Sequence, residues 1–269
     1  MKNIRTGRVV LITGESSGFG LEMAKLFLKN GDTVCGFSNQ QFQMDGIYHQ
    51  FGDISSEEEC QKCVDNVIAK YGRIDVLCNN AGFGIFGPIE ETPYEKAHRQ
   101  VAVSFFGAYL MAKAALPYMR KQGGGKIINT SSIGGVIPLP FQAFYSASKC
   151  AMDMLFDALR PEVYPYRIQI CSIKPGDAKT NFTANRQADV VKDDSPYKQA
   201  FDHCLKSVAH DEQSGIPAIK IAERVIKVSK RKKMPYSRSV GAKDKFLAGI
   251  YKCLPKRLKN YLLYKVYAS

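Results

Sequence analysis

Short apolar runs alternate with helix-like segments along the chain as far as Pro175. The apolar runs predict six buried strands, at Arg8–Thr13, Thr33–Ser38, near Ile47–Asp53, Ile74–Asn80, Lys126–Ser132 and Arg167–Pro175. The segments between them predict helices over Gly18–Lys29, about Ser55–Tyr71, Pro93–Arg99, Val101–Gln122 and Ala143–Val163. Strands that alternate with helices need right-handed crossovers, so the pattern predicts an α/β fold with a doubly wound parallel sheet.

The pattern weakens after Thr180, where a polar and poorly periodic segment begins. We interpret residues 181–215 as a lid over a substrate site. A further helix is expected over Pro217–Lys233, within a basic C-terminal extension at residues 216–269. The chain shows no internal repeat and no low-complexity linker, so we expect one domain, with residues 1–180 as its core and a helical C-terminal extension.

Length and composition fit this interpretation. The 269 residues are 45% hydrophobic, which is enough for one large core, and no apolar run approaches the roughly 20 residues of a membrane span. The eight cysteines are scattered and resemble reduced cytoplasmic thiols rather than a disulfide framework. Cys60 and Cys63 form a CxxC inside a helical segment with no partners to complete a zinc site, so no metal centre is expected.

The net charge of +13 is concentrated at one end of the chain. Residues 217–269 contain 15 Lys and Arg against 2 Asp and Glu, which accounts for the whole excess. Apolar residues are interleaved with these cations, so the segment suits contact with an anionic membrane surface, although a solvated basic face would look the same. No nucleic-acid recognition motif accompanies the charge, and binding to nucleic acid is not expected.

The first predicted strand runs directly into a glycine-rich turn, "TGESSGFG", which opens the first helix. Glycines at positions 14, 18 and 20 let the backbone turn tightly and approach a pyrophosphate, which the helix N-terminus then binds. Strand, turn and helix in this order predict a dinucleotide site. A carboxylate at the end of the second strand would favour NAD, but Ser38 and Asn39 stand there. This favours NADP(H) over NAD(H), with Ser16 as a further phosphate contact, although Glu15 lies close to such a phosphate in sequence.

Tyr145 and Lys149 stand four residues apart in "AFYSASKCAM", so they share one face of a helix. A nearby ammonium favours the phenolate and lowers the pKa of the phenol, which suits proton transfer near neutral pH. Taken alone, the same pair fits an ordinary surface helix.

Taken together, these motifs resemble the short-chain dehydrogenase/reductase family over essentially the whole chain. The resemblance rests on "TGESSGFG", Asp53 in "GDIS", "NNAG" at Asn79–Gly82, "SS" at Ser131–Ser132, the YxxxK of Tyr145 and Lys149, and "PGDAKT" at Pro175–Thr180. The C-terminal segment is most similar to the hydroxysteroid and retinol dehydrogenase branch. The resemblance implies a Rossmann-like sheet and hydride transfer between a nicotinamide cofactor and a carbonyl or alcohol.

The resemblance also implies roles for particular residues. Tyr145 would be the general acid in reduction, Lys149 would support it and bind the nicotinamide ribose, and Ser132 would hydrogen-bond the substrate oxygen. The expected cofactor-binding residues are Thr13, Gly14, Ser16, Ser17, Gly18, Phe19, Gly20, Ser38, Asn39, Asp53, Ile54, Asn79, Ala81, Gly82, Tyr145, Lys149, Pro175, Gly176 and Thr180. Simpler roles remain open for four of these side chains: helix capping for Asp53 and Thr180, a turn for Asn79, and an idle hydroxyl for Ser132.

One position departs from the family pattern. Ser104 in "VAVSFFGAYL" stands where family members carry an Asn that supports a water between the lysine and bulk solvent. The shorter Ser can still hydrogen-bond, so we expect a slower proton relay rather than loss of activity.

The loop between Ser132 and Tyr145 and the loop after "NNAG" indicate the substrate. Phe83, Phe86, Phe141 and Phe144 lie in these loops, and no Arg or Lys does, which favours a lipophilic steroid-like or retinoid-like carbonyl compound over a phosphorylated one, unless the rings only pack the core. The alternatives are the same chemistry on a small or polar ketone with NAD(H), and a cofactor-binding sensor of low turnover. By analogy with the family, we expect a homo-oligomer formed through Val101–Gln122 and Ala143–Val163. The reduced cysteines indicate a cytoplasmic location, which includes association with a membrane surface if the basic segment binds one.

Overall fold

A computed structural model describes residues 7–179, 187–188 and 191–267 of the chain. Its centre is a seven-stranded sheet in the order β11-β7-β6-β4-β1-β2-β3, in which every neighbouring pair is parallel. The strands are β1 (Val9–Thr13), β2 (Thr33–Ser38), β3 (Ile47–Phe51), β4 (Val76–Asn79), β6 (Gly125–Thr130), β7 (Ile168–Pro175) and β11 (Ser237–Val240). The predicted α/β fold with a doubly wound, Rossmann-like parallel sheet is confirmed.

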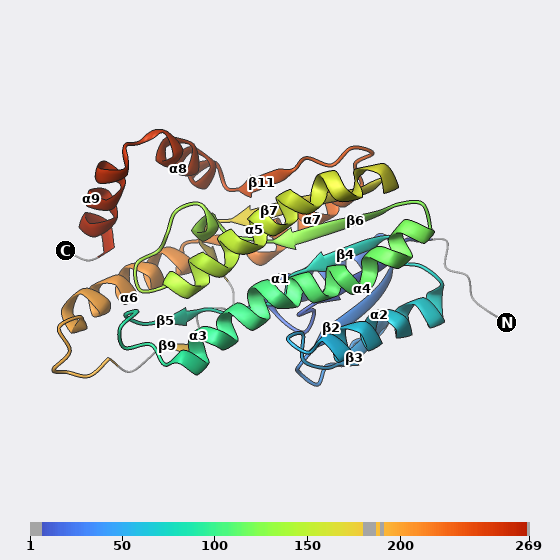
Figure 1. The fold of residues 1–269 in the computed structure, drawn as a ribbon, viewed down its shortest axis with the longest axis horizontal. Helices are drawn as coiled ribbons and strands as arrows, with labels where there is room; N and C mark the ends of the chain where they lie inside the picture. The colour runs from blue at the N-terminus through green and yellow to red at the C-terminus, as the bar shows by residue number, and fades with distance from the viewer. Residues whose placement is uncertain (1–6, 180–186, 189–190, 268–269) are drawn as a thin grey trace.

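Helices cover both faces of this sheet. The helices α2 (Glu57–Tyr71), α4 (Gly107–Lys121) and α5 (Ala143–Val163) cross one face, in front of the sheet in Figure 1. The helices α1 (Gly18–Lys29) and α7 (Ala218–Ser229) pack together on the other face. This three-layer arrangement leaves the carboxyl ends of the strands as the open edge.

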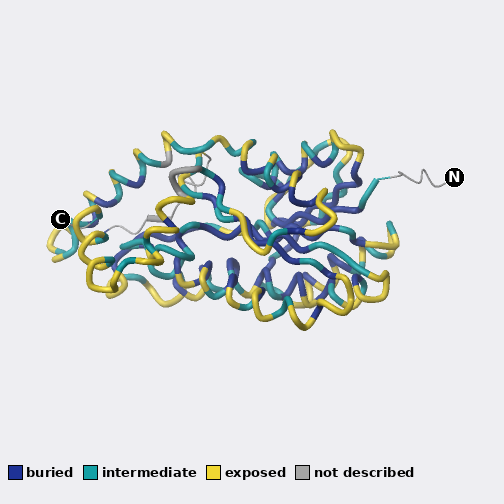
Figure 2. Tube along the Cα trace, turned by 90° about the horizontal axis from the view of Figure 1, so that it is seen from above, coloured by how far each residue is buried: buried dark blue, intermediate teal, exposed yellow. Residues whose placement is uncertain are grey.

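The alternation of apolar side chains along each strand explains the two layers. In β1, Val9 and Leu11 belong to the cluster under α2, α4 and α5, whereas Val10 and Ile12 belong to the cluster under α1 and α7. All four are buried, because a central parallel strand is covered on both faces. The buried segments of the trace lie between the exposed outer turns of the helices (Figure 2).

Two of the elements around the central sheet differ from the sequence prediction. The two helices expected around Gln100 form one continuous run, in which α3 (Tyr94–Val101) passes through a π-helical turn at Ala102–Phe106 into α4. The extra residue of the π-helical turn shifts the helical phase, so the apolar period changes without a break in the backbone. Strand β11 was not predicted, because it has only four residues, mostly polar or exposed, and forms by pairing with β7 at the sheet edge.

The C-terminal third adds helices beyond the sheet. Short parallel pairings join β5 (Ile85–Phe86) to β9 (Gln187–Ala188) and β8 (Ala178–Lys179) to β10 (Ile216–Pro217). Helix α6 (Lys198–Gln213) follows, and α8 (Ala242–Cys253) and α9 (Lys256–Tyr267) close the described chain at one end of the molecule (Figure 1). A small apolar cluster of its own, built on Phe86, Phe201 and Val208, lies under α6.

Within the described ranges, one helical run has the length and composition to cross a membrane, at Tyr94–Lys121. Half of its most apolar window is buried inside the protein. Its α4 part packs against the sheet and α2, which is the position of a core helix.

Candidate active site

A cleft of about 510 Å³ lies at the carboxyl ends of the strands and runs from the end of β2 to α6 and α9. It crosses the sheet where the strand order reverses, between β1 and β4, which is where open α/β sheets bind their ligands. The cleft has two ends, one lined by the glycine-rich turn and the other by apolar side chains.

The backbone of the glycine-rich turn packs so closely against its neighbours that side chains at Gly14 and Gly20 would not fit. Gly14 has φ of +68°, and a Cβ there would lie 3.0 Å from the Cα of Ala81. A Cβ on Gly20 would lie 2.0 Å from the carbonyl oxygen of Gly14. The Ser17 side chain does not cap α1, so the first N–H groups of the helix have no side-chain partner among the described residues. These residues fit a pyrophosphate, because they present backbone donors with no Cβ in the way.

The "NNAG" segment supports this turn from β4. Thr13 Oγ1 accepts hydrogen bonds of 2.9 Å from the backbone N–H groups of both Asn80 and Ala81. The Asn80 side chain donates to the carbonyl of Thr13 and lines the cleft. The Asn79 side chain instead points into the core, where it donates to Asn129 Oδ1 at 3.0 Å. Asn80 is therefore the asparagine of the pair that faces the cleft.

Uncharged side chains form the cleft wall at the end of β2. Ser38, Asn39 and Gln40 line it, and Ser16 Oγ donates to Gln40 Oε1 at 3.1 Å. Each offers polar atoms to a ribose or a phosphate, and none brings a carboxylate.

Glu15 lies behind β2, away from this wall. Its side chain is fully buried, and a Cβ on Gly36 would lie 2.3 Å or less from three of its atoms. His49 Nδ1 is 2.5 Å from Glu15 Oε1, so the carboxyl group has a basic partner. Burial raises the pKa of the Glu15 carboxyl, although the hydrogen bond with His49 opposes the rise. The expected proximity of Glu15 to a ribose phosphate is therefore not found.

Asp53 lines the cleft next to an arginine. Its Oδ2 accepts from Arg99 Nη1 at 2.8 Å, and its Oδ1 accepts from the backbone N–H of Ser55 at 2.9 Å. Burial alone would raise the pKa of Asp53, but the hydrogen bonds from Arg99 and Ser55 outweigh it and the pKa lies below its ordinary value. Asp53 thus both shapes the turn before α2 and presents a carboxylate to the cleft.

Ser132, Tyr145 and Lys149 meet on one wall of the cleft. A Cβ on Gly134 would lie 3.3 Å from Ser132 Oγ and 3.2 Å from Tyr145 Cε1, so both side chains border the same small space. Ser132 Oγ accepts from the backbone N–H of Gly134 at 2.9 Å, which fixes its orientation. Lys149 Nζ lies 5.8 Å from the centre of the Tyr145 ring, as the four-residue spacing predicts.

The ammonium group of Lys149 is buried. Burial lowers the pKa of its ammonium to about 8, and the Coulomb attraction of Asp153 offsets only part of the effect. Lys149 Nζ donates to the carbonyl of Thr130 at 2.9 Å. Asp153 has partners of its own, since its Oδ2 lies 2.6 Å from Lys174 Nζ and accepts from Ser131 Oγ.

Ser104 stands behind this group, in the π-helical turn between α3 and α4. It is buried, and its Oγ accepts from Gln100 Nε2 at 2.8 Å. A Cβ on Gly82 would lie 3.4 Å from Ser104 Oγ and 3.5 Å from Lys149 Nζ. The Ser104 hydroxyl and the Lys149 ammonium therefore face the same point beside Gly82. The position at which family members carry an Asn is thus adjacent to the lysine.

The far end of the cleft is mostly apolar. Its lining includes Phe83, Ile137, Leu139, Val208, Leu247 and Tyr267, with Asp177 and Asp211 as its acids. Phe86 and Phe141 do not line it, because they stack at 6.4 Å and pack with Phe201 in the small cluster under α6. Of the four aromatic residues expected there, only Phe83 borders the cleft.

The comparison with known proteins decides the family. The model of the short-chain dehydrogenase family matches residues 8–191. The chain belongs to this family. As a short-chain dehydrogenase/reductase, it is an NAD(P)-dependent oxidoreductase whose substrates are small carbonyl or alcohol compounds.

Several relatives resemble the dehydrogenase over its full length. A protein of Bacteroides thetaiotaomicron named 3-ketodihydrosphingosine reductase is 38% identical over 97% of this chain and 98% of its own. The probable short-chain type dehydrogenase/reductase VdlC of Helicobacter pylori is 31% identical over 92% and 93%. Among solved structures, a short-chain dehydrogenase of Streptomyces avermitilis superposes with a TM-score of 0.83 at 28% identity, over 97% of both chains.

Most of the residues predicted for the site line the cleft of this dehydrogenase. They are Gly14, Ser16, Ser17, Gly18, Phe19, Ser38, Asn39, Asp53, Ile54, Ala81, Gly82, Ser132, Tyr145, Lys149, Pro175 and Gly176. Thr13, Gly20, Asn79 and Ser104 lie behind its walls instead, and Thr180 is outside the described residues.

Two functional neighbours were missed in the sequence. Gln100 donates to Ser104 and also accepts from the backbone N–H of Ile85, so its buried amide fixes the π-helical turn against β5. Thr130 provides the carbonyl that accepts from Lys149. The available signal for Gln100 was a polar residue on a helix face that is otherwise apolar. Thr130 acts through its backbone carbonyl, which leaves no signal in a sequence.

Proposed function

We propose that the enzyme reduces the carbonyl group of a lipophilic substrate with NADPH, and oxidises the corresponding alcohol in reverse. The observation that carries the proposal is the meeting of Ser132, Tyr145 and Lys149 on one wall, between a glycine-rich nucleotide end and an apolar end. A carbonyl group bound at that wall has a proton donor and a hydrogen-bond donor beside it.

In this proposal the chain contributes binding and proton transfer. Tyr145 Oη protonates the substrate oxygen during reduction, and Ser132 Oγ–H stabilises the charge that develops on it. The ammonium of Lys149, 5.8 Å from the Tyr145 ring centre, favours the phenolate that remains. The glycine-rich turn, Asp53 and Lys149 would hold the cofactor, which when bound would supply the hydride.

The preference for NADPH rests on the wall at the end of β2. Ser38, Asn39 and Gln40 present no carboxylate that would repel a 2′-phosphate. The negative group nearest in sequence, Glu15, is buried behind Gly36 and paired with His49. Together these observations favour NADP(H) over NAD(H) more strongly than the sequence alone does.

The lipophilic character of the substrate is supported by the cleft and by a relative. The far end of the cleft is lined mainly by apolar side chains, and no Lys or Arg lines it to bind a phosphate within the described residues. The 38% identical relative is named for 3-ketodihydrosphingosine, a ketone on a long alkyl chain. We therefore place long-chain ketones first among substrates, ahead of the steroid-like and retinoid-like compounds first expected.

Three further expectations stay predictions. Exposed Phe106, at the end of the π-helical turn before α4, and exposed Met154 on α5 support a homo-oligomer formed through this part of the protein. The eight cysteines are all free, which suits the expected cytoplasmic location. Placement in the hydroxysteroid and retinol branch is the third.

The test is oxidation of NADPH and of NADH by the purified protein, followed at 340 nm, with 3-ketodihydrosphingosine, a ketosteroid, retinal and a small ketone. We expect NADPH turnover with the long-chain ketone, and loss of at least about 100-fold in rate for Tyr145→Phe, the scale of general acid catalysis. Tight binding of NADPH without turnover of any compound, or equal rates for Tyr145→Phe, would contradict the proposal.

A further inference from the structure

The two C-terminal helices expose apolar side chains that a helix in water normally buries. In α8, Phe246, Leu247 and Ile250 are 68%, 44% and 41% exposed. In α9, the exposed apolar residues are Leu258, Tyr261, Leu262, Tyr264 and Val266. No residue of α9 is buried. We name these eight residues the α8–α9 surface.

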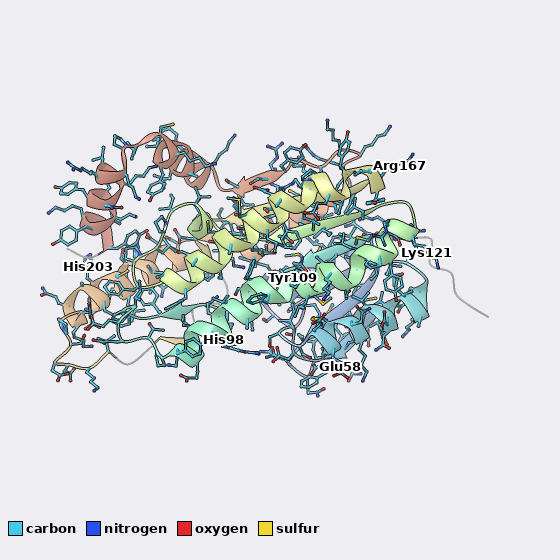
Figure 3. The ribbon with its side chains drawn as sticks, viewed as in Figure 1. Glu58, His98, Tyr109, Lys121, Arg167 and His203 are labelled. Atoms are coloured by element: carbon cyan, nitrogen blue, oxygen red, sulfur yellow. The ribbon has the colours of Figure 1, made fainter. Side chains whose placement is uncertain are left out.

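The exposed residues lie on the outer sides of their helices. At about 100° per residue, Phe246, Leu247 and Ile250 fall within one arc of α8. In α9 the exposed apolar residues span the side opposite Tyr267, whose ring packs on the cluster under α6. The side chains of both helices extend outward from the end of the molecule in Figure 3. Each of the two helices thus has an exposed apolar side, and neither side has a partner in the described part of the chain.

Charge identifies the partner. Residues 242–267 contain seven Lys and Arg and a single Asp, and Lys245, Lys252, Lys256, Arg257 and Lys265 are exposed. A symmetric contact with a second copy would bring two such cationic faces together, which is repulsive. A bilayer with anionic headgroups is complementary, since tyrosines and phenylalanines enter the interfacial region while lysine stems extend to the phosphates.

We propose that the α8–α9 surface binds the anionic surface of a lipid bilayer. Its apolar residues insert among the headgroups, and its cations contact the lipid phosphates. The surface is continuous with the cleft, because Leu247 belongs to both and Tyr267 lines the cleft from the inner side of α9. A bound bilayer would therefore lie beside the apolar end of the cleft, and a lipophilic ketone would enter without crossing water. This last step rests on the proposed function.

Co-sedimentation with vesicles tests the binding without any turnover. We expect the full chain to bind phosphatidylcholine vesicles with 30% phosphatidylglycerol at least about tenfold more tightly than pure phosphatidylcholine, since each cation near the surface contributes about fivefold. The triple change Phe246→Ser, Tyr261→Ser and Leu262→Ser should weaken the binding by about tenfold or more.

Two matched variants make the result specific. The triple change Phe51→Ser, Ile89→Ser and Tyr164→Ser removes exposed apolar residues elsewhere, which are on average more exposed than the three tested, and should leave the binding unchanged. The triple change Lys252→Gln, Lys256→Gln and Arg257→Gln should lower the preference for anionic vesicles, because it removes three of the seven cations. These positions lie outside the catalytic wall, so turnover of a soluble ketone should match the unchanged chain.

Three results would overturn the proposal. The first is equal sedimentation with anionic, neutral and no vesicles, and the second is full binding by the Phe246, Tyr261 and Leu262 variant. The third is a dimer in light scattering that this variant dissociates, which would assign the surface to a second copy. If vesicle binding follows the expectation while no ketone is turned over, the proposed substrate fails and the surface stands.

Discussion

Replacing Lys149 by Met should make the fold more stable while removing activity. The ammonium is buried, and its pKa falls from an ordinary 10.5 to about 8. At about 1.4 kcal/mol per pKa unit, this difference corresponds to about 3 kcal/mol of unfavourable free energy at neutral pH. Loss of the hydrogen bond to the Thr130 carbonyl costs about 1 kcal/mol. The net expectation for Lys149→Met is a gain of about 2 kcal/mol in the free energy of unfolding.

The pH dependence of this gain has a definite sign. Below pH 8 Lys149 is protonated in both states, so the wild type has the full cost. Between pH 8 and 10.5 the unfolded chain keeps the proton and the folded chain has lost it. Stability rises with pH wherever the unfolded state binds more protons, so the wild type becomes more stable relative to the variant over this window.

Urea denaturation of the cofactor-free protein at pH 7, 8, 9 and 10 measures both effects. Lys174→Met is the matched control and should destabilise the protein. Lys174 Nζ lies 2.6 Å from Asp153 Oδ2, so the change removes the ion-pair partner of a buried carboxylate. A Lys149→Met protein less stable than the wild type at pH 7, or a difference that is constant from pH 7 to 10, would refute the reasoning.

Two other substitutions test the site. Ser104→Asn should raise the rate of turnover several-fold where proton transfer limits it, and should lower the solvent isotope effect, because the longer amide extends toward Lys149. An unchanged rate, measured where chemistry is limiting, would show that this position does not limit the proton relay. Asn39→Asp should raise KM for NADPH relative to NADH by about tenfold, or about 1.4 kcal/mol, whereas Glu15→Gln should leave the ratio of the two KM values unchanged. A ratio that responds to Glu15→Gln and not to Asn39→Asp would contradict the assigned ribose wall.

The elements of the fold were predictable where the signal is local. Val9–Thr13 and Thr33–Ser38 are mostly apolar and are buried along their whole length, and such segments are typical of central parallel strands. Ser237–Val240 carries no such signal, because its edge position lets polar side chains face solvent and its pairing with β7 is a long-range contact. The π-helical turn at Ala102–Phe106 likewise depends on the surroundings of Ser104 and Gln100.

The site was predictable as a set of motifs but not as a set of contacts. The spacing of Tyr145 and Lys149 fixes their common face in any helix. The direction of Glu15 was not predictable, since it depends on the space under Gly36 and on His49 in a neighbouring strand. Asn79 and Asn80 are adjacent in sequence, and which one faces the cleft depends on their long-range partners, Asn129 for Asn79 and Thr13 for Asn80.

The small cluster under α6 has a consequence for the evolution of this enzyme. Phe86, Phe201 and Val208 pack with one another and with Phe141, and they belong to neither of the clusters that bury the sheet. Exchanges on α6 that reshape the apolar end of the cleft therefore act first on this small cluster and on the contacts of α6 with α9 and β8. The catalytic wall and the nucleotide turn pack on the sheet cores, which such exchanges leave in place. New substrate preferences can therefore arise by single substitutions in α6 without unfolding the catalytic site.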